Sequence, residues 1–99
     1  MASVLVVRDD ARRELLEACD YYDDHRRGYG QLFAEAVEHE LGLLMEFPSI
    51  GKSVGAAVHR RTLSDWPYSI YYRLRDEELI IIAVAHHRRR PGYWRSRLR

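Results

Sequence analysis

The residues with the clearest chemical potential lie near the C-terminal end, where two histidines precede a run of three arginines. Histidine titrates near neutral pH, so His87 could act as a general base or acid. Arg88 and Arg90 could bind a phosphate through paired hydrogen bonds, and Arg60 and Arg61 supply two further cations. These residue types predict a basic surface suited to an anionic partner.

The charges are divided unevenly between the two halves of the sequence. Residues 1–50 contain five arginines and eleven acidic residues, a net charge of −6, whereas residues 51–99 have a net charge of +7. Six arginines lie within residues 88–99. This division indicates either a basic face that meets an anionic partner or a pairing of the two halves across the fold. Charge alone does not distinguish the two.

Length and composition indicate one globular domain, residues 1–99. With 46% hydrophobic and 31% charged residues, the composition is that of an ordinary soluble protein. No apolar segment approaches the ~20 residues of a membrane span, and the N-terminus lacks the features of a signal peptide. A single cysteine, Cys19, leaves no intramolecular disulfide and suits a reducing compartment. We therefore expect a cytoplasmic protein that does not associate with a membrane.

The element that must position the basic end is a run of seven apolar residues, 79–85. Such a run indicates a strand covered on both faces or a short buried helix. Three consecutive isoleucines and a valine favour the strand, because β-branched side chains pack well on a pleated surface. We expect it to be the central strand. Along a strand His86 and His87 would point to opposite faces, so one of them should be a structural hydrogen-bonding residue.

The N-terminal half predicts a strand followed by two helices. Residues 3–8 are typical of a short strand, and the two aspartates after them predict the N-cap of an amphipathic helix of about four turns. Gly28 and Gly30 predict the end of that helix. A second amphipathic stripe over residues 33–45 predicts another helix, which ends before Pro48. Two adjacent helices with a short connection predict an antiparallel αα-hairpin.

The C-terminal half predicts strands. Residues 49–56 are typical of a loop, and residues 58–63 of a strand. Residues 68–75 alternate apolar and polar side chains, the pattern of a strand with one buried face, and residues 76–78 turn it into the apolar run. The order is β-α-α-β-β-β, an α+β fold with a small, twisted, mainly antiparallel sheet and the αα-hairpin on one face.

The sequence gives no support for a metal or a nucleotide cofactor. Cys19 is isolated, and no two histidines have the i, i+4 spacing of a helical zinc site. The glycines form neither a dinucleotide-binding pattern nor a Walker pattern. We therefore expect no cofactor and no metal.

Four motifs occur in the order found in a known family. They are Phe47-Pro48 with Gly51, the stretch Arg60-Arg61-Thr62-Leu63, residues 66–73, and residues 83–94 with Arg97 after them. Over nearly the whole chain this pattern resembles the RelE/ParE superfamily of small toxins from bacterial type II toxin–antitoxin systems. The Pro-Tyr-x-Ile-x-Tyr strand and the His-x-Arg-Arg-x-Pro-x-Tyr-Trp end most resemble the ParE and plasmid-stabilisation branch.

The resemblance implies one of two activities. ParE-like members bind DNA gyrase and poison it, whereas RelE-like members are ribosome-dependent endoribonucleases that cut mRNA. Both are held inactive by a cognate antitoxin, expected from an adjacent gene. A third alternative is a degenerate, non-toxic member that still binds an antitoxin. We favour the ParE-like interpretation, because RelE-like members carry a basic residue at the position of Ser69.

The resemblance also implies candidate site residues. A RelE-like nuclease would need a base for the ribose 2′-OH, cations for the phosphorane and an acid for the leaving oxygen. The residues available for these roles are Arg61, Arg73, His87, Arg88 and Tyr93. Contact with the target or the antitoxin would involve cationic and aromatic residues of two segments, namely Arg60, Arg61, His86, Arg88, Arg89, Arg90, Tyr93, Trp94 and Arg97.

Two further expectations concern apolar side chains. Trp94 could stack on a nucleobase, but an indole in a short tail is expected to fold back onto the core. Leu16, Leu32, Leu43 and Met45 lie off the main stripes of the two helices. A chain of this size cannot cover all of them, and the surface left exposed is a predicted antitoxin site.

Overall fold

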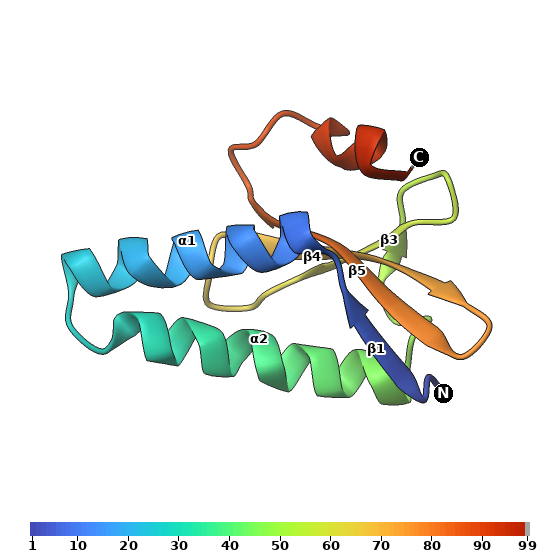
Figure 1. Cartoon of the computed structure of the whole chain (residues 1–99), viewed down its shortest axis with the longest axis horizontal. Helices are drawn as coiled ribbons and strands as arrows, with labels where there is room; N and C mark the ends of the chain where they lie inside the picture. Colours follow the sequence, from blue (N-terminus) through green and yellow to red (C-terminus); the bar gives the residue numbers. More distant parts are fainter. Residues whose placement is uncertain (99) are drawn as a thin grey trace.

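The computed structural model describes residues 1–98, which form a five-stranded sheet, two long helices and a short C-terminal 3-10 helix (Figure 1). In chain order these are β1 (Val4–Val7), α1 (Asp9–His25), α2 (Tyr29–Glu46), β2 (Lys52–Ser53), β3 (His59–Thr62), β4 (Tyr68–Arg75), β5 (Glu78–His86) and η1 (Tyr93–Leu98). The predicted α+β order is confirmed. Two elements were not predicted: β2, which lies within the expected loop, and η1.

The strands are arranged in the order β1-β5-β4-β3-β2. β1 pairs with β5 in parallel, and the other neighbours pair antiparallel. The prediction that β5 is central was wrong in detail, because the additional strand β2 makes β4 the middle strand. β5 is nevertheless an interior strand, as its apolar run indicated. It contains a bulge at Ile82, because Tyr71 pairs with Ala83 and Tyr72 with Ile81.

The two helices form an antiparallel hairpin that covers one face of the sheet, here called the helix-covered face (Figure 1). Period-two alternation along β4 directs every second side chain toward the helices. The fully buried side chains of this core come from both layers and include Phe33, Val37, Leu44, Ile70, Tyr72, Leu79 and Ile81. Burial of these apolar side chains is the main source of the stability of the fold.

The ends of the helices differ from the prediction in two places. Asp9 and Asp10 do not cap α1: the N-cap position is Arg8, and both aspartates lie in the first helical turn, where the helix dipole favours negative charge. Gly28 adopts the left-handed conformation (φ 90°) between the helices. Gly30, by contrast, lies inside α2 and is buried. It approaches α1 so closely that a Cβ there would lie 2.5 Å from the Cys19 carbonyl oxygen.

The opposite face of the sheet is covered by η1 and is called here the tail-covered face. Trp94 of η1 is buried in a small cluster with Val58, Ile82 and Ala83. Its ring lies 5.3 Å from the ring of Tyr71. The expectation that Trp94 folds back onto the core is confirmed. Because the bulge occurs at Ile82, both Ile82 and Ala83 contribute to this cluster.

Neither of the long helices, nor any other helix within residues 1–98, combines the length and the apolar character that crossing a membrane requires.

Candidate binding cleft

A cleft of about 330 Å³ opens on the tail-covered face, where β5 ends and the chain turns toward η1. We call it the basic cleft. Its floor is formed by side chains of β3 and β4 that point away from the helices, namely Arg60, Thr62, Ser69 and Tyr71, together with Ala85 of β5. Its cationic and aromatic lining residues are Arg60, Tyr71, His86, His87, Arg89, Arg90 and Tyr93.

His87 is held by a short chain of hydrogen bonds that crosses the sheet. Its backbone N–H donates to the Pro67 carbonyl oxygen at 2.8 Å. Its Nε2 atom lies 3.2 Å from the hydroxyl of Ser69, which in turn lies 3.1 Å from the hydroxyl of Thr62. Ser69 is buried, so its hydroxyl is a fixed partner for the imidazole. The chain orients His87 over the floor of the cleft.

His86 is the last residue of β5, and its ring lies edge-on to that of Tyr68 at 5.1 Å. Its Nδ1 atom accepts a hydrogen bond from the Arg88 backbone N–H at 3.0 Å. Burial, followed by the positive charges of Arg88 and His87, lowers the pKa of His86 below its ordinary value. Both histidines line the same cleft, because the strand ends between them. The hydrogen bond between His86 and the Arg88 backbone is of the kind expected of one of the two histidines at the strand end.

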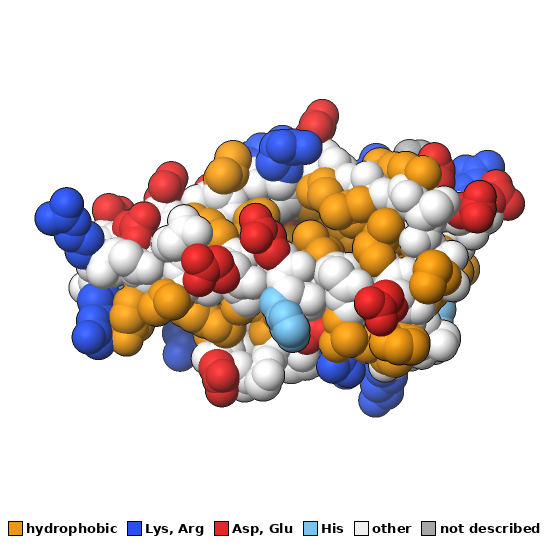
Figure 2. Space-filling model, turned by 90° about the horizontal axis from the view of Figure 1, so that it is seen from below, with side chains coloured by type: hydrophobic (Ala, Val, Ile, Leu, Met, Phe, Trp, Pro, Cys, Tyr) orange, Lys and Arg blue, Asp and Glu red, His pale blue; other side chains and the backbone are white. Residues whose placement is uncertain are grey.

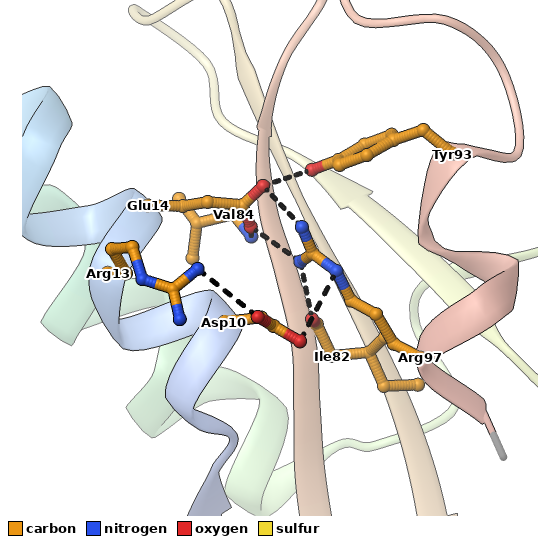
Figure 3. Close-up of polar contacts among 7 residues, drawn as sticks. All are labelled: Asp10, Arg13, Glu14, Ile82, Val84, Tyr93 and Arg97. Carbon is orange, nitrogen blue, oxygen red and sulfur yellow. Dashed lines mark hydrogen bonds and ion pairs between the residues drawn. The ribbon is translucent and has the colours of Figure 1, made fainter.

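Glu14 of α1 joins three parts of the molecule (Figure 3). Its carboxylate accepts hydrogen bonds from Val84 N–H at 3.1 Å and from the Tyr93 hydroxyl at 2.6 Å. It also forms a bidentate pair with Arg97, at 2.8 and 3.0 Å. Arg97 in addition donates to the Ile82 carbonyl oxygen at 3.0 Å. These contacts satisfy two backbone groups of β5 that lie beyond the end of β1, the Val84 N–H and the Ile82 carbonyl. They also fix η1 to the sheet.

The same contacts constrain the tyrosine that forms one wall of the cleft. Burial, followed by the hydrogen bond to Glu14, raises the pKa of Tyr93. Its hydroxyl proton is directed at Glu14, away from the cleft. The guanidinium of Arg89 lies over the Tyr93 ring at 4.0 Å from its centre. Tyr93 therefore positions Arg89 through its ring and η1 through its hydroxyl.

The remaining predicted site residues are dispersed. Arg61 points to the helix-covered face, where its Nε lies 3.1 Å from the carboxylate of Glu40. Arg73 lines a different cleft on the tail-covered face. Arg88 is exposed in the turn after β5, and Trp94 is buried. Adjacent residues on a strand alternate between faces, which separates Arg61 from Arg60.

Three residues of the basic cleft and its supporting contacts were not among the site residues predicted from the sequence. Ser69 and Tyr71 line the basic cleft, and the alternation along residues 68–75 could have placed them on the same face as Arg60. Glu14 gives no such signal. It lies on the polar side of an amphipathic helix, and its partner Arg97 is 83 positions away.

Known proteins resemble this chain both in sequence and in the arrangement of sheet and helical hairpin. The family described as "ParE toxin of type II toxin-antitoxin system, parDE" matches residues 5–91. A search of curated proteins gives no significant match. The match with the ParE toxin family covers most of the chain, including β5 and the arginine run.

Solved structures with a similar fold come from both branches of the superfamily. The chromosomal ParDE toxin–antitoxin system of P. aeruginosa matches with a TM-score of 0.63 and 19% identity, over 84% of this chain and 94% of that one. The intact RelBE complex of E. coli gives a TM-score of 0.67 and 22% identity, covering 89% and 100%. The isolated E. coli RelE toxin gives 0.66 and 22%, covering 98% and 97%.

The fold is therefore that of the RelE/ParE toxins, which the motifs in the sequence indicated. The chain belongs to the ParE toxin family and is a toxin component of a type II toxin–antitoxin system.

Proposed function

We propose that this toxin arrests growth by binding DNA gyrase, that the basic cleft and the arginines around it contact the target, and that the protein does not cut RNA itself. The observation that carries the proposal is the dispersal of the five residues that a RelE-like nuclease would use. Two of these residues, His87 and Tyr93, line the basic cleft. The other three, Arg61, Arg73 and Arg88, are not among its lining residues.

The chemistry of those two residues also argues against RNA cleavage. A general acid must deliver its proton to the leaving oxygen, but the Tyr93 hydroxyl donates to Glu14 and its pKa is raised. Arg61 is neutralised by Glu40 on the helix-covered face. Arg60, Arg89 and Arg90 remain at the cleft, without a carboxylate within 4 Å among residues 1–98. This arrangement suits binding of an anionic surface better than general acid–base catalysis.

The proposed antitoxin site lies on the outer surface of the hairpin. Figure 2 shows the face that carries α2, where hydrophobic side chains form several exposed patches among charged ones. Leu16 and Leu32 are 57% and 50% exposed, as predicted, whereas Leu43 and Met45 are half-buried. A hollow at the tip of the hairpin is lined by Tyr29, Leu32 and Trp66. Exposed apolar surface of this kind is typical of a partner site.

The target is tested with purified gyrase and the full-length toxin. We expect the toxin to inhibit supercoiling and the R89Q/R90Q variant to require roughly ten times more protein for the same inhibition, because two exposed charge contacts are lost. The matched control is R12Q/R27Q, which removes two exposed arginines of the helical hairpin. Primer extension on translated mRNA should show no codon-linked cuts.

Three outcomes would contradict the proposal. Codon-linked cuts that disappear in a folded H87A variant would establish the RelE-like activity. Equal loss of gyrase inhibition in R12Q/R27Q and R89Q/R90Q would show that net charge, and not the cleft, governs binding. Antitoxin binding without growth arrest or gyrase inhibition would indicate the degenerate class.

The antitoxin site is tested separately, by co-purification with the product of the adjacent gene. L16E and L32E should each reduce the yield of complex, because a carboxylate would have to be buried in an apolar contact. The matched control is Glu35→Gln, an exposed α2 position. Normal complex formation by both leucine variants would place the antitoxin elsewhere.

A further inference from the structure

The 3-10 helix η1 divides the tail-covered face into two clefts. The cluster around Trp94 includes Tyr71 and Tyr93, which line the basic cleft, and Ile82 and Leu98, which line a second cleft. This second cleft has a volume of about 500 Å³, within the range of ligand sites. We call it the aliphatic cleft, and its main lining residues are Arg8, Arg73, Arg75, Ile80, Ile82 and Leu98.

Three arginines surround the aliphatic cleft. Arg8 follows β1, and Arg73 and Arg75 lie two positions apart on β4, so both point to the tail-covered face. Among residues 1–98, no carboxylate lies within 4 Å of any of these guanidinium groups. This holds even for Arg75, whose cross-strand partner is Glu78. Within the described part of the chain, the cleft therefore presents three cations without a paired carboxylate.

The floor between these cations is aliphatic. Ile80 is half-buried and Ile82 is fully buried beneath the cleft, and Leu98 of η1 closes one side. None of the described lining residues is aromatic. The basic cleft differs in this respect, because it contains two tyrosines and two histidines.

The lining of the aliphatic cleft indicates which class of ligand it can bind. Binding of single-stranded nucleic acid without sequence preference typically uses aromatic rings on which the bases stack, and the aliphatic cleft offers none. An aliphatic side chain would fit its floor, and carboxylates beside that side chain would pair with the arginines. We propose that the aliphatic cleft binds an acidic peptide segment of a partner protein, anchored by an aliphatic side chain between flanking carboxylates. The proposal does not depend on gyrase as the target.

The test uses the full-length toxin and a synthetic probe. The probe is a fluorescein-labelled nine-residue peptide with leucine at the centre and glutamates on both sides, and its control carries glutamine in place of every glutamate. We expect binding of the acidic peptide, measured by fluorescence anisotropy, and at least tenfold weaker binding of the glutamine peptide. The R73Q/R75Q variant should bind the acidic peptide roughly tenfold more weakly, since two ion pairs are lost.

Two controls separate the cleft from general electrostatics. R12Q/R27Q lowers the net charge by the same amount at exposed hairpin positions, and its affinity should stay within roughly twofold of the wild type. R60Q/R90Q removes two arginines of the basic cleft and should also bind the peptide nearly normally. Melting curves check the fold of each variant, and R75Q alone, at an exposed position, replaces the double variant if that variant unfolds.

The site is located by amide chemical shifts on peptide titration. Shifts confined to residues 73–82 and to η1 would support the proposal. Shifts confined to residues 86–93, equal binding of the glutamine peptide, or equal weakening by R12Q/R27Q would overturn it. Competition by a single-stranded oligonucleotide of equal charge, at equal concentration, would assign the cleft to nucleic acid and also overturn it.

Discussion

The two faces of the sheet are built in different ways. The helix-covered face is packed by two long helices whose apolar stripes form one continuous core, with Phe33, Ile70 and Tyr72 fully buried. The tail-covered face is crossed by the six residues of η1, which Trp94 and the Glu14–Arg97 pair hold in place. On either side of η1, this face is left open as an arginine-lined cleft.

This difference separates stability from binding. A continuous apolar core contributes free energy in proportion to buried area but offers little surface for recognition. A short segment fixed by a few specific contacts leaves most of a sheet face accessible, at the cost of local stability. Substitutions on the two faces should therefore have different consequences, and the following predictions test that expectation.

The largest effect is expected in the core of the helix-covered face. Phe33 is fully buried, with its ring 5.3, 5.1 and 4.8 Å from those of Tyr22, Trp66 and Tyr68. Phe33→Ala should lower the free energy of unfolding by about 3–5 kcal/mol, through lost burial and a residual cavity. Trp94→Ala should cost less, because η1 can detach without unfolding the sheet. Urea titration checks both, and a Trp94→Ala loss as large as that of Phe33→Ala would contradict the distinction between the faces.

The second prediction concerns the contact that fixes η1. Glu14→Ala leaves Arg97 without its main partner and Val84 N–H without an acceptor. Both charged side chains are 14% exposed, so removal of one should cost roughly 3 kcal/mol. Hydrogen exchange should show faster exchange at residues 93–98 than in the hairpin. The matched control is Glu17→Ala, an exposed α1 position, which should change stability by less than about 0.5 kcal/mol.

The pair can be isolated by a double-mutant cycle. If Glu14 and Arg97 stabilise each other directly, the combined E14A/R97A variant should lose less stability than the two single variants added together, by more than about 0.5 kcal/mol. Strict additivity would mean that Glu14 acts mainly through Val84 and Tyr93.

The third prediction tests how closely the helices of the hairpin approach each other. A methyl group at Gly30 would meet the Cys19 carbonyl oxygen at 2.5 Å and the Asp23 carboxyl carbon at 2.7 Å. Gly30→Ala should therefore destabilise the protein by about 1–3 kcal/mol, the usual cost of overpacking. The control is Gly42→Ala in the same helix, where a Cβ would meet no atom within 4 Å. That substitution should stabilise the helix slightly, and a melting temperature lower than that of the wild type would show that glycine has another role there.

The sequence predicted the elements whose cause is local. Three isoleucines at 80–82 define β5, and alternation over residues 68–75 defines β4, because strand formation here depends on side chains within each segment. η1 was missed because a helix of six residues has little stability of its own. Its position depends on Glu14 and Trp94, which act through contacts with residues far away in the sequence.

The candidate site also depends on contacts between residues far apart in the sequence. Arg60, His86, His87, Arg89, Arg90 and Tyr93 were predicted from residue type and from the family resemblance, and the fold brings them to one cleft. Arg61 and Arg73 were grouped with them, although strand alternation and position along the sheet place them elsewhere. Residue type therefore predicted which side chains bear charge, but the fold decided which of them act together.

The smallest effect is expected from His86, at the edge of the basic cleft. Burial and the nearby charges of Arg88 and His87 lower its pKa in the folded protein below the value of 6.5 that applies to the unfolded chain. In the interval just below pH 6.5 the unfolded chain therefore binds more protons than the folded protein, and stability falls as the pH decreases through it. Below the folded-state pKa this contribution is constant. His86→Gln should abolish this part of the pH dependence, measured as the difference in unfolding free energy between wild type and variant from pH 7.5 to pH 5.

Because a bound anion favours the protonated imidazole of His86, an anionic ligand in the basic cleft should reduce this difference between wild type and variant. A ligand bound in the aliphatic cleft should leave it unchanged, so that the same titration distinguishes the two clefts.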